Sequence, residues 1–198
     1  EFRKYITIDE KRTAEFDFSQ LNPHLLYHGN YKEVGSEDAY DRVLDGEHRK
    51  VVKKAFNAMV QASTPLKSCP SEIDMSGLEM SWAELRDRII KAHKPIADLF
   101  FKGVGNHLQF QDSNIAERVM LHFAGMDAPA LPVHDSFILH HAYGESGEVE
   151  EAMRRAFHDE MREPISKIDK EILTWSYRKD EDDTEETRAL DLDAILSG

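Results

Sequence analysis

The segment LPVHDSFILHH, residues 131–141, places a His-Asp pair inside an apolar run. The apolar side chains on both sides of the pair are typical of buried strands; they are Leu131, Val133, Phe137, Ile138 and Leu139. A charged side chain in such a setting is costly unless something uses it. We therefore expect strands at 130–133 and 136–142, with Asp135 between them as a functional candidate.

Other strands and helices follow from periodicity and end signals. Alternating apolar and polar residues predict a hairpin from residues 3–9 and 13–19, and a last strand at 171–178. Helical patterns are found at 23–29, 38–61 with a break at Gly46, 81–101, 112–125 and 146–161. Ser81 and Glu84 form a capping box, and Pro95 predicts a kink or boundary in the helix that they begin. Residues 63–80 are expected to be a loop.

This order of elements predicts an α+β fold. Two strand pairs separated by a long helical stretch indicate an antiparallel sheet with helices on one face and an inserted helical lobe. A doubly wound parallel sheet would need strict alternation of strands and helices. We assign residues 1–37 and 104–179 to the sheet part, residues 38–103 to the helical insertion, and residues 180–198 to an acidic tail.

Composition indicates a cytoplasmic globular protein. The chain has 198 residues with 40% hydrophobic and 32% charged residues. No apolar run approaches the roughly 20 residues of a membrane span, and no signal peptide is recognisable, so no membrane partner is expected. The single cysteine, Cys69, excludes an internal disulfide framework.

The net charge of −13 is unevenly distributed. Residues 180–193 carry eight acids and one Arg, whereas residues 47–56 carry four Lys or Arg and one Glu. A solvated terminus accounts for the first cluster. The charge balance therefore neither excludes nor indicates a nucleic-acid partner.

Two aspartates occupy comparable places in the predicted strands. Asp17 ends the strand AEFDF, and Asp135 lies between two strand segments. If these strands are neighbours, their carboxylates can hold two divalent cations for in-line phosphoryl transfer. Magnesium suits such a sparse oxygen site, because water and substrate phosphates complete its coordination. The alternative is that each Asp is a turn or cap residue, with Asp17 capping the next helix.

The predicted helix RKVVKKAFNAMVQ, residues 49–61, has one basic face. Arg49, Lys53 and Asn57 are spaced one turn apart, and an apolar face lies opposite them. Arg and Lys in such a row can grip a triphosphate, Arg by paired hydrogen bonds and Lys as a point charge. The alternative is an ordinary amphipathic helix with a solvated basic side.

Together these segments resemble the motifs of family A DNA polymerases. EFDFSQLNPHL resembles motif A, usually D-Y-S-Q-I-E-L-R, and RKVVKKAF resembles motif B, with an Arg and a Lys four residues apart. LPVHDSF resembles motif C, V-H-D-E, or the H-D-S form of single-subunit phage RNA polymerases. LQFQDSNIAERVM resembles the Gln-bearing helix before motif C. The four segments occur in the family's order, and the resemblance covers residues 3–178.

The resemblance implies a polymerase-type palm sheet with residues 38–103 as fingers. It implies template-directed nucleotidyl transfer from nucleoside triphosphates to a primer 3′ end, with primer-template nucleic acid as the partner. Mg²⁺ or Mn²⁺ would be the cofactor. Asp17 and Asp135 would be the metal-binding carboxylates, and Phe18 would contribute its backbone carbonyl to one metal.

The resemblance also gives roles to other residues. Arg49 and Lys53 would hold the triphosphate, and Lys53 could protonate the leaving pyrophosphate. Gln109 would contact the primer–template duplex. His134 would lie near the primer end, with a packed structural histidine as the alternative.

Several positions depart from the family pattern. Asn22 replaces a Glu that helps to exclude the ribose 2′-hydroxyl, so the choice of sugar is in doubt. His24 replaces Arg, Asn57 and Gln61 replace an aromatic residue and a Tyr, and Ser136 replaces the acid after the motif C aspartate. With a short fingers stretch and no thumb, the chain would be a minimal or truncated module that takes a thumb from further domains or partner proteins.

Rival interpretations come from other classes of protein. The main one is a catalytically inactive palm-like scaffold in a replication or mobile-element complex, which the departures favour. An HD-type phosphohydrolase also uses a His-Asp pair, but on an all-helical core. A histidine metal site would draw on residues without regular ligand spacing: His122, His134, His140 and His141. The sequence leaves open the template and product type, oligomeric state and pathway.

Overall fold

The computed structural model describes residues 3–35, 37–165 and 168–173. Within them the fold is mixed α+β, as predicted, with a four-stranded antiparallel sheet. The chain forms two compact units: a sheet unit, Glu1–Ser19 with Asn114–Gly198, and a helical unit, Gln20–Ser113. The predicted boundaries at residues 37 and 104 stay a prediction. The acidic tail, residues 180–198, lies outside the described residues.

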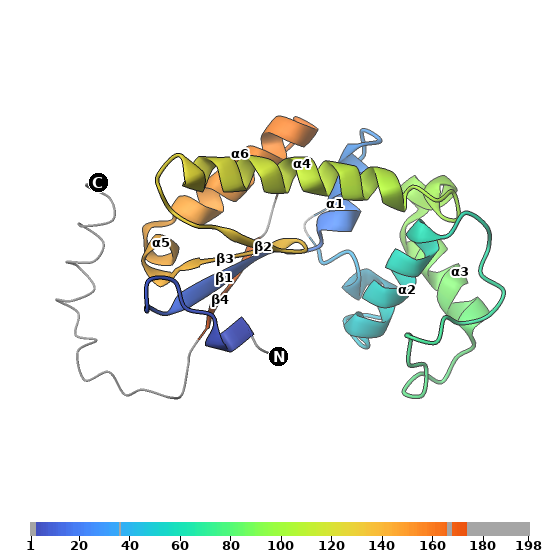
Figure 1. The fold of residues 1–198 in the computed structure, drawn as a ribbon. Helices are drawn as coiled ribbons and strands as arrows, with labels where there is room; N and C mark the ends of the chain where they lie inside the picture. Colours follow the sequence, from blue (N-terminus) through green and yellow to red (C-terminus); the bar gives the residue numbers. More distant parts are fainter. Residues whose placement is uncertain (1–2, 36, 166–167, 174–198) are drawn as a thin grey trace. The chain divides into compact units, whose positions relative to one another are not determined.

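The sheet unit is built on β1 (Thr13–Phe18), β2 (Leu131–Val133), β3 (Ser136–His140) and β4 (Ile168–Leu173), in the order β2-β3-β1-β4. Two helices, α5 (His141–Ser146) and α6 (Glu148–Met161), follow β3. Residues 114–124 of α4 (Gly105–Ala124) also belong to this unit and lie with α6 over one face of the sheet (Figure 1). The hairpin predicted around His134 and Asp135 is therefore confirmed.

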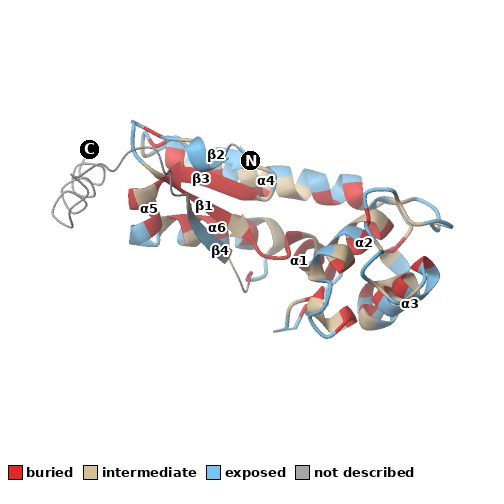
Figure 2. Ribbon diagram, turned by 90° about the horizontal axis from the view of Figure 1, so that it is seen from below, coloured by how far each residue is buried: buried red, intermediate tan, exposed pale blue. Residues whose placement is uncertain are grey.

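The helix-covered face of the sheet is an aromatic core. The ring of Phe18 packs against those of Phe137 in β3 and Phe157 in α6, each with centroids 6.3 Å away. α5 approaches so closely that a Cβ at Gly144 would lie 3.0 Å from the Phe16 ring. β1 and β3 form the buried centre of the sheet (Figure 2). Side-chain alternation along β1 then puts Glu15 and Asp17 on the opposite face.

The predicted strand at residues 3–9 is wrong. Residues Arg3–Tyr5 form a 3-10 helix, η1, and only an isolated bridge between Ile8 and Lys11 remains of the hairpin. Both edges of β1 are already paired, one with β3 and the other with β4. A local hairpin partner therefore has no free edge of β1 to join.

The helical unit matches most of its predicted elements. It contains α1 (Leu21–His28), η2 (Asp41–Val43), α2 (Arg49–Gln61), α3 (Trp82–Ala92), η3 (Lys94–Leu99) and the start of α4. The Ser81–Glu84 capping box is present, and Pro95 opens a separate 3-10 segment. α4 begins at Gly105, earlier than the predicted residue 112. Among the described helices, none is long and apolar enough to cross a membrane.

Two buried histidines lie in the helical unit. His93 is fully buried, bonds the Tyr27 hydroxyl through Nδ1 at 3.0 Å, and packs against the ring of Phe56. Burial, assisted by the charge of Arg42, lowers the pKa of His93 to about 4. Burial and the neighbouring His28 likewise lower the pKa of His24 to about 4. Both imidazoles are therefore neutral at pH 7.

Candidate active site

Asp17 and Asp135 come from neighbouring strands of the sheet unit. Asp17 pairs in register with Ser136, and the amide of Phe18 donates a 3.1 Å hydrogen bond to the Asp135 carbonyl. Both aspartates are half-buried. The cap position of α1 is occupied by Gln20, so Asp17 is not the capping residue of that helix.

Asp135 is a turn residue, as one of the alternatives predicted. It forms the two-residue link between β2 and β3 together with His134, which is exposed and has a positive φ of 56°. Positive φ is uncommon outside glycine. Strand alternation ends at this turn, so the register does not assign the Asp135 carboxylate to a face. Convergence of the two carboxylates stays a prediction.

A buried polar cluster adjoins this turn. The Ser136 hydroxyl lies 2.6 Å from Glu15 Oε1 and 2.9 Å from the carbonyl oxygen of Val133. The Glu15 side chain is only 11% exposed and also pairs with the Arg3 guanidinium. Sequence reasoning overlooked Glu15 and counted Ser136 only as a departure from a motif.

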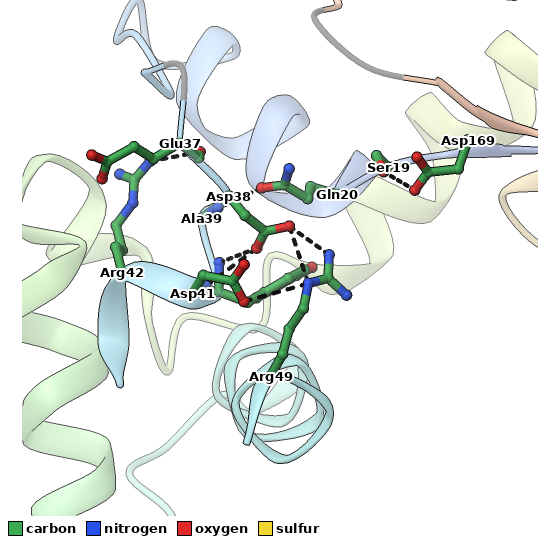
Figure 3. Close-up of polar contacts among 10 residues, drawn as sticks. Ser19, Gln20, Glu37, Asp38, Ala39, Asp41, Arg42, Arg49 and Asp169 are labelled. Atoms are coloured by element: carbon green, nitrogen blue, oxygen red, sulfur yellow. Dashed lines mark hydrogen bonds and ion pairs between the residues drawn. The ribbon is translucent and has the colours of Figure 1, made fainter. Parts of the chain in front are cut away.

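Asp169 is a further acid that sequence reasoning missed. It lies on β4 directly opposite Asp17, and the Ser19 hydroxyl donates to its carboxylate (Figure 3). Opposed residues of antiparallel strands project from the same face, and like charges at such positions are destabilising. The strand predicted from the sequence began at residue 171, so it left out Asp169, which the structure places within β4.

The donor set at this edge of the sheet suits a sparsely coordinated divalent cation. No group of three or more His, Cys, Asp or Glu side chains in the described ranges is arranged to hold a metal ion. Mg²⁺ does not need one, because it uses one or two carboxylates together with water and substrate phosphates. Asp17 and Asp135 supply that number. A preformed, all-protein metal cage is not what these residues offer.

Arg49, in the helical unit, is already engaged with a carboxylate. Its Nε and Nη2 donate to Asp38 Oδ2 at 3.0 and 2.7 Å, and Asp41 lies 3.7 Å away (Figure 3). The guanidinium also stacks over the Tyr40 ring. Burial alone would raise the pKa of Asp38, but hydrogen bonds from Arg49 and from backbone amides hold it below the usual value.

Two other predicted nucleotide-site residues contact each other. Asn22 Nδ2 in α1 donates a 3.0 Å hydrogen bond to Asn57 Oδ1 in α2. Lys53, one turn before Asn57, is half-buried, and no carboxylate pairs with it in the part of the chain that the structure describes. The apolar face of α2 is buried, as predicted, with Val52 and Phe56 fully enclosed.

The remaining candidates are placed as follows. Gln109 is exposed on α4. Phe18 directs its side chain into the aromatic core, which leaves only its backbone to serve a metal. The histidines proposed for the alternative metal site have other contacts: His122 Nε2 lies 2.6 Å from Glu148, and His140 accepts from the Ala142 amide.

Comparisons with known proteins add one distant likeness. No protein-family model and no curated protein matches the sequence. Among solved structures the chain is similar to the POL domain of Pol1 from M. smegmatis, in complex with DNA primer-template and dNTP, with 12% identity and a TM-score of 0.45. The similarity covers 86% of this chain and 41% of that chain. At these values it carries no argument about the site, which stands on its own residues.

Proposed function

We propose that this chain catalyses template-directed nucleotidyl transfer onto a primer 3′ end, as a minimal or truncated DNA polymerase-like module. The observation that carries the proposal is the direct pairing of β1 with β3, which joins the backbones around Asp17 and Asp135. Their segments, 118 residues apart in the numbering, are the two that resemble polymerase motifs A and C. Strand pairing between them is what a shared metal site requires.

In this proposal Asp17 and Asp135 bind Mg²⁺ or Mn²⁺, with the Phe18 carbonyl as a further ligand. The bound cations would polarise the phosphoryl group and stabilise the charge on the attacking and leaving oxygens. The chain's own task would be to hold the two carboxylates close together. The opposed Asp17 and Asp169 support a cation at this face, because it would relieve the repulsion between them.

The triphosphate would be held by α2. Lys53 supports this role as a half-buried residue whose ammonium pairs with no carboxylate among the described residues. Lys53 would also protonate the leaving pyrophosphate. Arg49 would bind the triphosphate after its guanidinium exchanges the Asp38 carboxylate for a phosphate. The exchange is feasible because carboxylate and phosphate groups both accept paired N–H donors from Arg.

Sugar selection would depend on Asn22 and Asn57. The amide nitrogen of Asn22 donates to Asn57, so its Oδ1 is the group that would accept a hydrogen bond from a ribose 2′-hydroxyl. The shorter Asn side chain leaves room for that hydroxyl, which a Glu at this position would crowd. Discrimination against ribonucleotides is therefore expected to be weak.

The nucleic acid would be contacted by Gln109, which is exposed on α4, and by His134, which is exposed at the turn before Asp135. Further domains or partner proteins would supply a thumb.

Primer extension tests the proposal. The full chain is incubated with Mg²⁺ or Mn²⁺, a primed template, and deoxynucleotides or ribonucleotides in separate reactions. We expect extension with both nucleotide sets, at rates that differ less than the 10⁴- to 10⁵-fold of a polar sieve. Extension with deoxynucleotides alone would remove the argument about Asn22. No extension with any template or metal, including in the presence of a thumb-bearing partner, would remove the polymerase function.

A non-catalytic scaffold is the second candidate. The pairing of Arg49 with Asp38 favours it, because a structural ion pair has no need of a nucleotide. Equilibrium binding of a nucleoside triphosphate with Mg²⁺ separates the two functions. The scaffold predicts no binding, and the polymerase module predicts saturable binding.

A further inference from the structure

The buried pair of Glu15 and Ser136, with the exposed Arg3 beside it, is unusual for the centre of a sheet. Glu15 is 9% exposed and Ser136 is 3% exposed, on the two central strands. A buried carboxylate is costly unless it is paired and hydrogen-bonded. Glu15 has both kinds of partner, an ion pair with Arg3 and a hydrogen bond with Ser136.

The hydroxyl of Ser136 connects the turn to the neighbouring strand. It lies 2.9 Å from the carbonyl of Val133, on the other side of the two-residue turn, and 2.6 Å from Glu15 on β1. A hydroxyl carries one hydrogen, which these two acceptors share. The contact therefore closes the turn and attaches it to β1 through side chains, in addition to the backbone pairing.

The cluster attaches the turn that carries Asp135, the candidate metal ligand, to β1. Asp135 immediately precedes Ser136, and Glu15 lies two residues before Asp17 on the same face of β1. The adjacent His134 has a positive φ, a conformation that costs free energy and has to be held by its surroundings. Loss of the hydroxyl would remove the side-chain hydrogen bonds that tie this turn to β1 and to Val133.

From this geometry we infer that Glu15 and Ser136 are positioning residues that hold Asp135 in place beside Asp17 for metal binding. Glu15 acts as a hydrogen-bond acceptor at Ser136 and does not itself touch the metal. Arg3 compensates its charge. The inference deepens the proposed nucleotidyl transfer and rests on it, because it assigns the cluster to the same two carboxylates.

Mn²⁺ titration of the full chain, followed by electron paramagnetic resonance, tests the inference without requiring catalysis. Ser136→Ala is expected to raise the Mn²⁺ dissociation constant roughly three- to tenfold, the range of one hydrogen bond. Ser136→Thr, which restores the hydroxyl, is expected to recover most of the affinity. Glu15→Gln keeps an acceptor oxygen and should lie within about threefold of wild type, whereas Glu15→Leu should resemble Ser136→Ala.

Controls separate positioning from loss of folding. Ser113→Ala removes a hydroxyl that bonds only the Phe110 carbonyl on the surface of α4, and it should leave Mn²⁺ affinity unchanged. If Ser136→Ala does not fold, Ser136→Cys replaces it, because a thiol keeps the volume and is a weak donor. In primer extension the same variants should raise the half-saturating metal concentration and leave the KM for nucleotide unchanged.

Each outcome distinguishes the two proposals. Wild-type Mn²⁺ affinity in Ser136→Ala and Glu15→Leu would overturn the positioning role and leave nucleotidyl transfer standing. Weakened Mn²⁺ binding in a chain that extends no primer would support the positioning role and remove the reaction. A wild-type chain that binds no Mn²⁺ would overturn both.

Discussion

The acidic edge of the sheet unit and the basic face of α2 are organised in different ways. The backbones around Asp17 and Asp135 are joined by strand pairing, in which hydrogen bonds fix the neighbouring segments. Arg49 is held by a side chain from an irregular segment, Asp38, through an ion pair. Strand pairing cannot change without unfolding the sheet, whereas an ion pair can exchange one anion for another. In the proposed function the backbone of the acidic edge would therefore be preorganised, whereas Arg49 would have to exchange Asp38 for phosphate.

Asp135→Asn is expected to reduce activity more than any other substitution at the acidic edge. The substitution keeps the shape and removes a charged metal ligand. Mutation of a residue that only orients a metal ligand lowers metal affinity or activity by roughly 10- to 100-fold. Because Asp135 would be a ligand itself, the rate of primer extension should fall by more than roughly 100-fold. Circular dichroism should remain that of the wild type.

Asp127→Asn is the matched control for this variant. Asp127 is exposed and also has a positive φ, of 54°, which Asn tolerates. Its activity should equal that of the wild type. If the Asp135→Asn variant instead kept wild-type activity, Asp135 would not belong to the active site.

Acid pH should destabilise the helical unit through its buried histidines. The pKa values of His24 and His93 are lowered to about 4, so the folded state resists protonation that the unfolded state accepts near pH 6.5. Stability is therefore complete above pH 6.5 and is lost as the pH falls toward 4. The loss should be on the order of 3 kcal/mol per histidine.

Urea unfolding at pH 7.5, 5.5 and 4.5 measures this loss. His93→Phe should reduce the pH dependence by about half, since one of two such groups is removed. His107→Gln, at an exposed position, should leave it unchanged. A pH dependence in His93→Phe equal to that of the wild type would contradict the assignment.

Arg49→Ala tests whether the basic face binds phosphate at all. A charged hydrogen bond contributes about 1.5–3 kcal/mol, and triphosphate affinity should fall by that amount at low salt. Isothermal titration with a nucleoside triphosphate and Mg²⁺ measures it. Lys50→Ala removes a neighbouring exposed charge and serves as the control. Unchanged affinity in Arg49→Ala would assign the arginine to structure alone.

Asp38→Asn should have the opposite effect to Arg49→Ala and strengthen triphosphate binding. The amide keeps the acceptor that caps the backbone amides of Tyr40 and Asp41, but loses the charge that competes for Arg49. Triphosphate affinity should rise by about 1 kcal/mol. Reduced affinity would show that Asp38 positions the guanidinium for the ligand rather than competing with it.

Local patterns predicted much of the fold. Alternation around Phe16 and the apolar run around Phe137 identified the two central strands, and the spacing of Val52 and Phe56 identified the buried face of α2. Residues 3–9 also alternate, but β4, far away in the sequence, takes the edge of β1 that they would have joined. Which of two segments pairs with an edge of β1 depends on contacts between residues far apart in the sequence, and the alternation of apolar and polar residues gives no information about such contacts.

The side-chain environment of the site was harder to predict. Asp38 begins the segment 38–61 that was predicted to be helical, but before α2 the structure forms only the 3-10 helix η2 there. Helical spacing therefore gave no signal of the pairing between Asp38 and Arg49. Asp169 lies two residues before the strand expected at 171–178, of which residues 174–178 lie outside the described part. Glu15 alternates correctly with its neighbours, and a buried Glu in a central strand could have been recognised as a signal.

The two-residue turn at His134 and Asp135 also limits how this protein can evolve. Val133 and Ser136 pair directly across it, so an inserted residue that slipped β3 by one position would reverse its faces. Phe137 would leave the aromatic core and Ser136 would enter it. Natural variants should therefore keep the length of this turn while they vary that of the loop at residues 63–80, where insertions are inexpensive.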